Sequence, residues 1–472
     1  MTIHYRHSTM RPMLRWFLLA VCTVCASAQV LLPYEQFDTD GIPPDVYKQR
    51  RERLAAAHTA RSLIVLLSAD VRNRQNDVDY EYRQNSNLLY LTGCSEPRCA
   101  LVIVPGGAEW NGGKVTELFF VPPRNPERET WTGVQMGPEE AERLLGIRPV
   151  LDYALLGAVL DSLLADRDTL YIASGLPTPS VTIPIVGKRI EIEHILRDSL
   201  QRRHPNVVVR TSLRTLAAMR EVKDEHELRL LRKAIETTLD AFEQVLRSVQ
   251  PGMNEYEIEA LMEYHFRRAG AEDVGYPSIV GSGYNSCILH YQKNRRPTRA
   301  GDVVLADCGA EYHGYTADIT RTFPISGRFT PEQRTLYLLV LEAQDSAIAA
   351  ARVGAPFRAT HRAAESVIAR GLMELGIIES AAQVRRYFPH GTSHYLGLDV
   401  HDAGTYGPLR AGTVITVEPG IYIPPGSPCP ERWWNIGIRI EDDVLVTESG
   451  PVNLSARLAR HPDQIEALMQ KR

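Results

Sequence analysis

The chain has 472 residues, of which 44% are hydrophobic and 23% are charged, a composition typical of globular proteins. Its length exceeds what one hydrophobic core usually organises, so at least two domains are expected. A formal net charge of −4 does not indicate nucleic acid or an anionic membrane as a partner, so the function has to be read from a site.

Residues 1–34 contain no Asp or Glu, unlike the rest of the chain. Arg11 and Arg15 precede the apolar run WFLLAVCTVC, and small residues follow at Ala26 and Ala28. This order predicts a cleaved secretory signal peptide at residues 1–28 and export to the periplasm or the cell exterior. The apolar run is too short to cross a bilayer, so no stable membrane span is expected after processing. An organellar transit peptide, an uncleaved anchor and a cytoplasmic protein are the alternatives.

Cysteine usage does not indicate a complete disulfide framework. Of the seven cysteines, two lie in the leader and five remain, which is an odd number. Cys94 and Cys99 could bridge in an oxidising compartment, whereas isolated buried thiols are the more common arrangement in a protein of this length.

An α/β domain is predicted for residues 29–211. Val46–His58 lacks Gly and Pro and follows two prolines, which predicts a helix. The apolar runs SLIVLLSA, NLLYLTG, CALVIVPGG and KVTELFFVPP are predicted strands, most of them ended by Gly or Pro. They alternate with the helical segments EEAERLL and LLGAVLDSLLA, as in α/β domains, and NVVVRT is the predicted last strand.

The pattern changes near Thr211, and residues 212–472 are predicted to form a second domain of α+β class. Apolar residues at three- and four-residue steps predict two amphipathic helices, which Pro251-Gly252 separates. Further helices are expected at about 331–351 and 358–375, followed by strands between 412 and 447. The helices should pack on an antiparallel sheet.

A weak internal repeat lies in this second domain. Gly301–Asp307 reads GDVVLAD and Gly412–Glu418 reads GTVITVE, so each is a glycine, a hydrophobic strand and a terminal carboxylate. Each is followed by a returning segment with another carboxylate, Asp318 or Glu441. A duplicated half whose acids face a shared centre would explain this pseudo-twofold pattern.

The first hairpin brings two carboxylates together. If its turn is centred on Tyr312-His313, Asp307 and Asp318 lie directly opposite each other, with Cβ atoms about 4.5–5.5 Å apart. Such a pair would repel, and one acid would take up a proton unless a cation were bound. The second pair consists of Glu418 and Glu441. A proline-rich insert that is predicted to be a loop separates these two residues in the sequence.

The segment PHGTSHYLGLDVHD supplies His390, His394 and His401. Four carboxylates and one imidazole would form an oxygen-rich site for two divalent metals about 3.5–4 Å apart. Oxygen dominance favours manganese, while zinc, cobalt and iron also bind such donors. Each residue alone has an ordinary structural interpretation as a turn, cap or solvated strand end. The joint pattern favours a metal site.

Five segments resemble the metallopeptidases of the pita-bread fold and, within them, aminopeptidase P (Xaa-Pro aminopeptidase). They are IVGSGYNSCILHY, DCGAEYHGYTADITRTFP, HGTSHYLGLDVHD, VEPGIYI and GIRIEDDVLVTESG. YEYRQNSNLLYLTG resembles the extra N-terminal domain of the long aminopeptidases P. The resemblance extends from about Tyr47 to the C-terminus and implies a pita-bread catalytic domain after a smaller α/β domain.

The resemblance also implies a two-metal site. Asp318 and Glu441 would bridge the ions, Glu418 would also serve as the general base, and a hydroxide between the metals would be the nucleophile. The five implied ligands are Asp307, Asp318, His394, Glu418 and Glu441.

Further residues are implied to act on the substrate. His290 and His401 match histidines that bind substrate and stabilise the tetrahedral intermediate, and their protonated forms would suit a developing oxyanion. His390 matches another pocket histidine. Arg439 is expected to orient the ligand carboxylates, and Tyr422 is a weaker candidate for the pocket wall.

The implied reaction is release of the first residue from peptides with proline at position 2, by an enzyme that forms a homodimer or homotetramer. The bond to proline is a tertiary amide without an N–H, so peptidases that need that group fail on it. The nearest alternative is an Xaa-Pro dipeptidase, which cleaves only dipeptides. Methionine aminopeptidase shares the catalytic fold but lacks an N-terminal domain like the one predicted for residues 29–211. A non-catalytic binding module and a metal-free creatinase-like enzyme are the alternatives of other classes.

Overall fold

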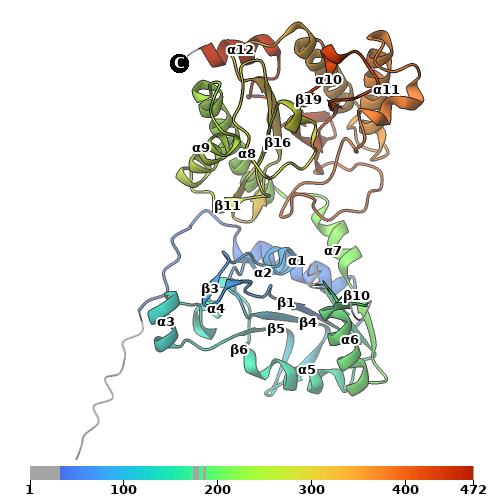
Figure 1. Cartoon of the computed structure of the whole chain (residues 1–472). Helices are drawn as coiled ribbons and strands as arrows, with labels where there is room; N and C mark the ends of the chain where they lie inside the picture. Colours follow the sequence, from blue (N-terminus) through green and yellow to red (C-terminus); the bar gives the residue numbers. More distant parts are fainter. Residues whose placement is uncertain (1–31, 174–179, 184–187, 471–472) are drawn as a thin grey trace, which may run out of the picture.

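The structure, a computed structural model, describes residues 32–173, 180–183 and 188–470. Two halves stand one above the other and are connected by helix α7 (Leu213–Arg220) (Figure 1). Within the described part, no helix is both long and apolar enough to cross a membrane. The predicted signal peptide lies outside the described residues.

The N-terminal half is built on a six-stranded mixed sheet with strand order β10-β7-β1-β4-β5-β6. Its elements are α1 (Pro44–Ala56), β1 (Ser62–Leu67), β2 (Asn73–Gln75), β3 (Val78–Asp79), α2 (Ser86–Thr92), β4 (Ala100–Trp110), β5 (Gly113–Val121), α3 (Pro126–Thr132), α4 (Pro138–Leu145), β6 (Val150–Asp152), η1 (Tyr153–Leu155), α5 (Leu156–Leu164), β7 (Thr169–Ile172), β8 (Ser180–Ile183), β9 (Lys188–Glu191), α6 (Ile192–Arg203) and β10 (Val208–Thr211).

Both faces of this sheet are buried. Along β4, Leu101 and Ile103 join a core shared with α1 and α2, whereas Val102 and Val104 join a second core with α5. The first core continues into the other half through Leu230 and Leu398 and joins the two halves without a break. The helices α1 and α2 accordingly lie on the face turned toward that half (Figure 1).

Most predicted elements of this half are confirmed, but NLLYLTG is not a strand. It lies in helix α2, where the Asn85 side chain accepts hydrogen bonds from the backbone N–H groups of Asn87 and Leu88. Gly93 ends the helix with φ +70°. These two caps satisfy the ends of a short helix, and they outweigh an apolar run that is compatible with either structure. The predicted domain boundary near Thr211, where β10 ends, stays a prediction.

The C-terminal half packs helices against small antiparallel sheets, as predicted for an α+β domain. Its elements are α8 (Glu225–Ser248), α9 (Glu255–Arg268), β11 (Asp273–Val274), β12 (Ile279–Ser282), η2 (Gly283–Cys287), β13 (Val303–Cys308), β14 (Ala310–Tyr312), β15 (Tyr315–Thr316), β16 (Ile319–Pro324), α10 (Pro331–Ala350), α11 (Ala359–Glu374), η3 (Ala381–Arg386), β17 (Val414–Val417), β18 (Gly420–Ile423), η4 (Glu431–Trp433), β19 (Ile436–Arg439), β20 (Asp442–Thr447), β21 (Gly450–Asn453) and α12 (Pro462–Gln470).

The predicted repeat is present as two hairpins. Gly301 and Gly412, which precede β13 and β17, both have positive φ angles, of +90° and +86°. The two hairpins meet where the Glu441 N–H donates to the carbonyl oxygen of Thr320, at 3.1 Å. This junction places the ends of both strand pairs at one centre.

The register of the first hairpin differs from the prediction. Asp307 pairs with Thr320, and the turn residues are His313 and Gly314, with φ +49° and +79°. Two positive φ angles define a type I′ turn, in which glycine is favoured at the second position. The shift moves the partner of Asp307 by two residues. Because side chains alternate with period two, Asp318 stays on the same face.

Candidate metal and substrate site

The carboxylates of the first hairpin converge despite the register shift. The hydroxyl of Tyr276 lies 2.6 Å from Asp307 Oδ1 and 2.6 Å from Asp318 Oδ1. Tyr276 was not among the predicted residues, because a lone tyrosine before a short strand carries no sequence signal. Asp307 also accepts a hydrogen bond from Arg439 Nη2 at 2.6 Å. The prediction that Arg439 orients a carboxylate of this cluster agrees with that contact.

The second pair of carboxylates enters from the other hairpin. Val417 pairs with Asp442 and Gly420 with Arg439, so the same register places Glu418 opposite Glu441. The proline-rich insert forms a loop between β18 and β19, as predicted.

His394 completes the cluster. Asp318, His394 and Glu441 each offer a ligand atom, and these atoms all lie within 4.8 Å of one another. His394 Nε2 is 3.3 Å from Asp318 Oδ2 and 3.6 Å from Glu418 Oε1. Its Nδ1 is 3.0 Å from the carbonyl oxygen of Tyr395, which can only accept, so Nδ1 carries the proton. Nε2 is thereby left free to donate its lone pair to a metal.

The electrostatics of the cluster fit a divalent cation. Burial and neighbouring carboxylates raise the pKa of Asp307 and Glu441, and burial raises the pKa of Glu418 to about 7. Burial lowers the pKa of His394, but Asp318 and Glu418 outweigh burial and raise this pKa to about 9. Without a cation, these groups would hold protons to relieve repulsion. Oxygen-rich donors around one imidazole are suited to divalent metals.

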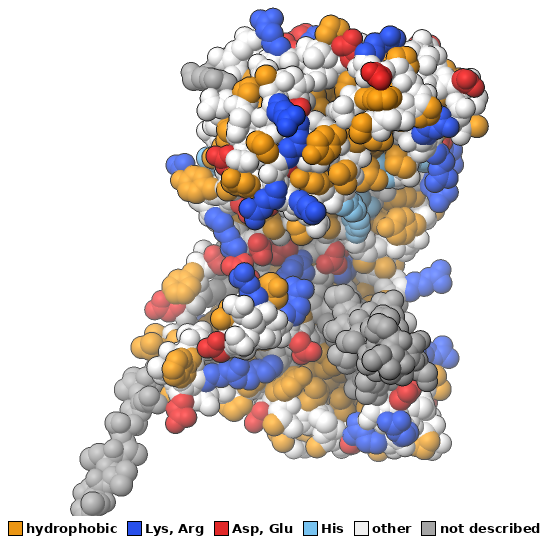
Figure 2. Space-filling view, viewed as in Figure 1, with side chains coloured by type: hydrophobic (Ala, Val, Ile, Leu, Met, Phe, Trp, Pro, Cys, Tyr) orange, Lys and Arg blue, Asp and Glu red, His pale blue; other side chains and the backbone are white. Residues whose placement is uncertain are grey.

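The predicted substrate residues surround the same cavity, which has a volume of about 440 Å³. Figure 2 shows histidine side chains (pale blue) exposed at the waist between the two halves. The titratable side chains that line the cavity are Tyr276, His290, Asp307, Asp318, His390, His394, His401, Glu418, Arg439 and Glu441.

Two of these histidines are held in a neutral form. Burial and the neighbouring Arg439 lower the pKa of His390 to about 3. Its Nε2 lies 2.9 Å from the hydroxyl of Tyr422, to which Arg439 donates at 3.0 Å. Burial and His394 lower the pKa of His401, so a protonated His401 at neutral pH is not supported. A neutral imidazole can still donate its single N–H to a developing oxyanion.

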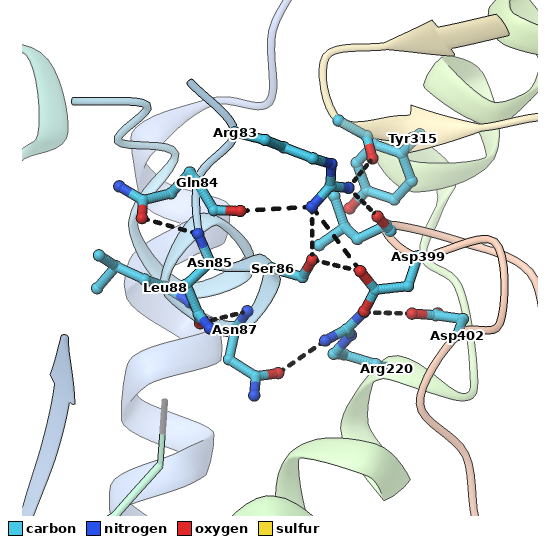
Figure 3. Close-up of polar contacts among 12 residues, drawn as sticks. Arg83, Gln84, Asn85, Ser86, Asn87, Leu88, Arg220, Tyr315, Asp399 and Asp402 are labelled. Atoms are coloured by element: carbon cyan, nitrogen blue, oxygen red, sulfur yellow. Dashed lines mark hydrogen bonds and ion pairs between the residues drawn. The ribbon is translucent and has the colours of Figure 1, made fainter. Parts of the chain in front are cut away.

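Residues of the N-terminal half hold the loop between His394 and His401 (Figure 3). Arg83 donates to the carbonyl oxygen of Leu398 and, at 3.0 Å, to the hydroxyl of Ser86. The Ser86 hydroxyl donates to Asp399 Oδ1 at 2.6 Å. Both N-terminal residues belong to the YEYRQNSNLLYLTG segment. That segment therefore contacts the loop that carries two site histidines.

A buried ion-pair network fixes the other end of this loop (Figure 3). Arg220, the last residue of α7, donates to Asp399 at 2.7 Å, to Asn87 at 2.8 Å and to Asp402. Lys223 donates to the second oxygen of Asp402 at 2.8 Å. Although burial alone would raise it, Arg220 and Lys223 lower the pKa of Asp402. The sequence pattern did not identify this network.

Comparisons with known proteins match both halves of the chain. The model of metallopeptidase family M24 matches residues 229–448, and that of the aminopeptidase P N-terminal domain matches residues 47–171. The Xaa-Pro aminopeptidase of Escherichia coli is 37% identical over 435 residues, covering 90% of this chain and 97% of the relative. The chain belongs to metallopeptidase family M24.

Solved structures of M24 relatives share the fold along nearly the whole chain. Pseudomonas aeruginosa aminopeptidase PepP superposes with a TM-score of 0.83 at 34% identity, covering 92% of this chain and 99% of the relative. Escherichia coli aminopeptidase P with the inhibitor Pro-Leu gives 0.82 at 35% identity, covering 91% and 99%. The predicted architecture, a pita-bread domain after a smaller α/β domain, is confirmed.

The strand end Glu441–Asp443 is buried, although an EDD triplet is usually solvated. Asp442 pairs with the buried Arg321 at 2.7 Å. Asp443 Oδ2 accepts the N–H of Asp318 at 3.2 Å. In this M24 peptidase, the acids that follow Glu441 therefore hold neighbouring backbone and side-chain groups of the candidate metal site in place.

Proposed function

We propose that this chain is a metal-dependent Xaa-Pro aminopeptidase, which hydrolyses the first bond of peptides that have proline at position 2. The observation that carries this proposal is the convergence of His394 and four carboxylates, three of them buried and Glu418 partly buried, on one cavity. The relatives that match the chain along its length, named Xaa-Pro aminopeptidase, support the substrate class.

In this proposal, the cluster of carboxylates and His394 holds two metal ions that activate a water molecule. Two divalent ions held there would supply a nucleophile at neutral pH, because they lower the pKa of bound water. The residues that would hold them are Asp307, Asp318, His394, Glu418 and Glu441. Glu418 would accept the proton that the nucleophile loses.

The cavity histidines orient the peptide. His290 and His401 would donate N–H groups to the scissile carbonyl as negative charge develops on its oxygen. His390 and Arg439 line the cavity beside them, and the Tyr422 hydroxyl, which is not among the lining groups, hydrogen-bonds to both and so holds them as a rigid wall. A rigid wall is suited to the rigid ring of proline, which loses little entropy on binding.

Product analysis tests the proposal. Arg-Pro-Pro-type peptides should lose their first residue when manganese is added, whereas matched peptides with alanine at position 2 should not. Comparable rates on both would show that the proline assignment is wrong. Cleavage of Xaa-Pro dipeptides alone would instead support the dipeptidase alternative. The M24 relatives that match over full length do not favour that alternative.

For the metal, we propose manganese, because oxygen donors outnumber the single imidazole. Metal analysis of protein purified without added metal, followed by reactivation of the stripped protein with each candidate ion, tests this. A protein without bound metal and without metal-dependent activity would support the creatinase-like or non-catalytic alternatives.

We further propose that the protein is exported after cleavage behind Ala28 and that it assembles as a homodimer or homotetramer. The leader composition supports export. N-terminal sequencing of the native protein and light scattering on the purified protein test the two statements. A mature chain that begins near Met1 and is recovered from the cytosol would contradict export.

A further inference from the structure

A second cavity, of about 590 Å³, adjoins the cavity of about 440 Å³ that the candidate metal ligands line. The two share His390, Gly391 and Ser393 in their walls. The second cavity lies between the N-terminal part of α11 and the segment from η3 to Ser393. Because the walls are shared, a peptide held in the first cavity needs only a short extension to enter the second.

Three arginines line this second cavity, and we call it the arginine pocket. They are Arg358, Arg362 and Arg385, and all three side chains are exposed. Among the described residues, none of the three has a carboxylate within ion-pair distance. By contrast, the nearby Arg370 lies 2.5 Å from Glu342. The arginine pocket therefore carries positive charge that no described carboxylate neutralises through an ion pair.

The other lining groups leave this charge in excess. Glu365 is the only acid in the lining, and it lies 3.8 Å from His361 Nε2. Burial lowers the pKa of His361, with Arg358 and Arg385 acting in the same direction, against the effect of Glu365. With three arginines, one glutamate and two neutral histidines, His361 and His390, the pocket lining has a net charge of +2.

The pocket also offers apolar surface. Phe357, Phe388 and Tyr406 line it beside the arginines. Aromatic walls with a few cations are typical of sites that bind organic anions rather than free inorganic ions. Guanidinium groups pair with carboxylates through two parallel hydrogen bonds. The chemistry of the pocket fits a peptide carboxylate.

We propose that the arginine pocket binds a carboxylate of the substrate on the C-terminal side of the proline. This proposal rests on the proposed aminopeptidase function. An extended residue spans about 3.3–3.6 Å, so one or two residues past the proline can reach a cavity that shares a wall with the first. The carboxylate comes either from an Asp or Glu side chain or from the C-terminus of a short peptide. The enzyme then prefers acidic or short substrates.

The experiment compares four peptides on the wild-type enzyme loaded with manganese. They are an Arg-Pro-Ala-Ala amide, which has no carboxylate (the acid-free amide), the same sequence as a free acid, and amides with Glu or Gln at the third position. We expect kcat/KM to be about 5- to 10-fold higher for the acid-bearing peptides, mainly through KM, because exposed charge pairs contribute modestly. The advantage should decrease at high salt, since exposed charges are screened. An advantage for Glu alone or for the free acid alone assigns the source of the carboxylate.

A triple variant, Arg358→Gln, Arg362→Gln and Arg385→Gln, should lose this preference while it cleaves the acid-free amide at the wild-type rate. Arg386→Gln is the matched control, because Arg386 is the sequence neighbour of a pocket arginine but does not line the pocket. Equal rates of the wild-type enzyme on peptides with and without a carboxylate would overturn the proposal, as would a preference that survives the triple substitution. If the acid-free amide is cleaved in those cases, the aminopeptidase function stands. Failure of the wild type on every peptide overturns both.

Discussion

Replacing Asp402 by asparagine should keep the size of the side chain but remove its negative charge from the buried ion-pair network with Arg220 and Lys223. The Asp402 side chain is 2% exposed and lies between Arg220 and Lys223, whose side chains are 3% and 0% exposed. Asparagine keeps the size but offers one oxygen and one NH2 group. Whichever way the amide turns, one of the two cations faces a donor instead of an acceptor.

The expected loss follows from this geometry. Removing one partner from a buried ion pair costs about 3–5 kcal/mol, because the remaining charge stays buried and unpaired. Asp399 still accepts from Arg220, so the uncompensated cation is chiefly Lys223. For a half of about 250 residues, this loss corresponds to a decrease in Tm of about 6–20 °C. Activity should also fall at temperatures where the variant is folded, because the loop ends at His401.

Thermal unfolding followed by circular dichroism measures the loss, with Asp345→Asn as the control. Asp345 pairs with Arg460 at 2.8 Å, but its side chain is 58% exposed, so the control should shift Tm by less than about 2 °C. The folded state holds the pKa of Asp402 below its ordinary value, so its stabilisation is present above about pH 4 and is lost as pH falls through the folded pKa. The difference between wild type and variant should therefore shrink in acid. A Tm within about 2 °C of wild type and unchanged activity would refute the reasoning.

Three further predictions concern the site and its loop. Asp318→Asn should lower metal occupancy and reduce turnover by about two orders of magnitude or more, while the metal-free variant is no less stable than the metal-free parent; full metal content with near-normal turnover would contradict this. Metal affinity should rise between about pH 6 and 9, because Glu418 and His394 must lose their protons to bind; calorimetry in two buffers of different ionisation enthalpy measures the released protons, and a pH-independent affinity would count against the site. Gly397→Ala should lower Tm and activity together, because a Cβ there would lie 2.2 Å from Asp402 Oδ2, whereas Gly157→Ala, with no atom within 4 Å, should not; equal Tm values for the two variants would contradict it.

Local sequence patterns were sufficient to predict an element where its own residues supply the apolar periodicity and the caps. The helices α8 and α10 follow from apolar periodicity and from capping boxes at Asp224 and Thr330. The chemistry of the metal cluster also followed from sequence, since four carboxylates at the ends of repeated strand motifs need a cation wherever they meet. The prediction for α2 was wrong, because a short apolar run fits either structure until its caps at Asn85 and Gly93 are recognised.

The sequence by itself determined the two-part organisation, the repeat, and which acids and histidines are the candidates for the site. Tertiary structure alone decided which distant groups meet: Tyr276 with two carboxylates, Arg83 and Arg220 with the loop before His401, and three arginines around one pocket beside the cavity. The physical reason is that periodicity and capping act between residues a few positions apart. A hydrogen bond between Arg83 and Leu398, by contrast, joins residues 315 positions apart in the sequence, and only the packing of two complete halves brings them together.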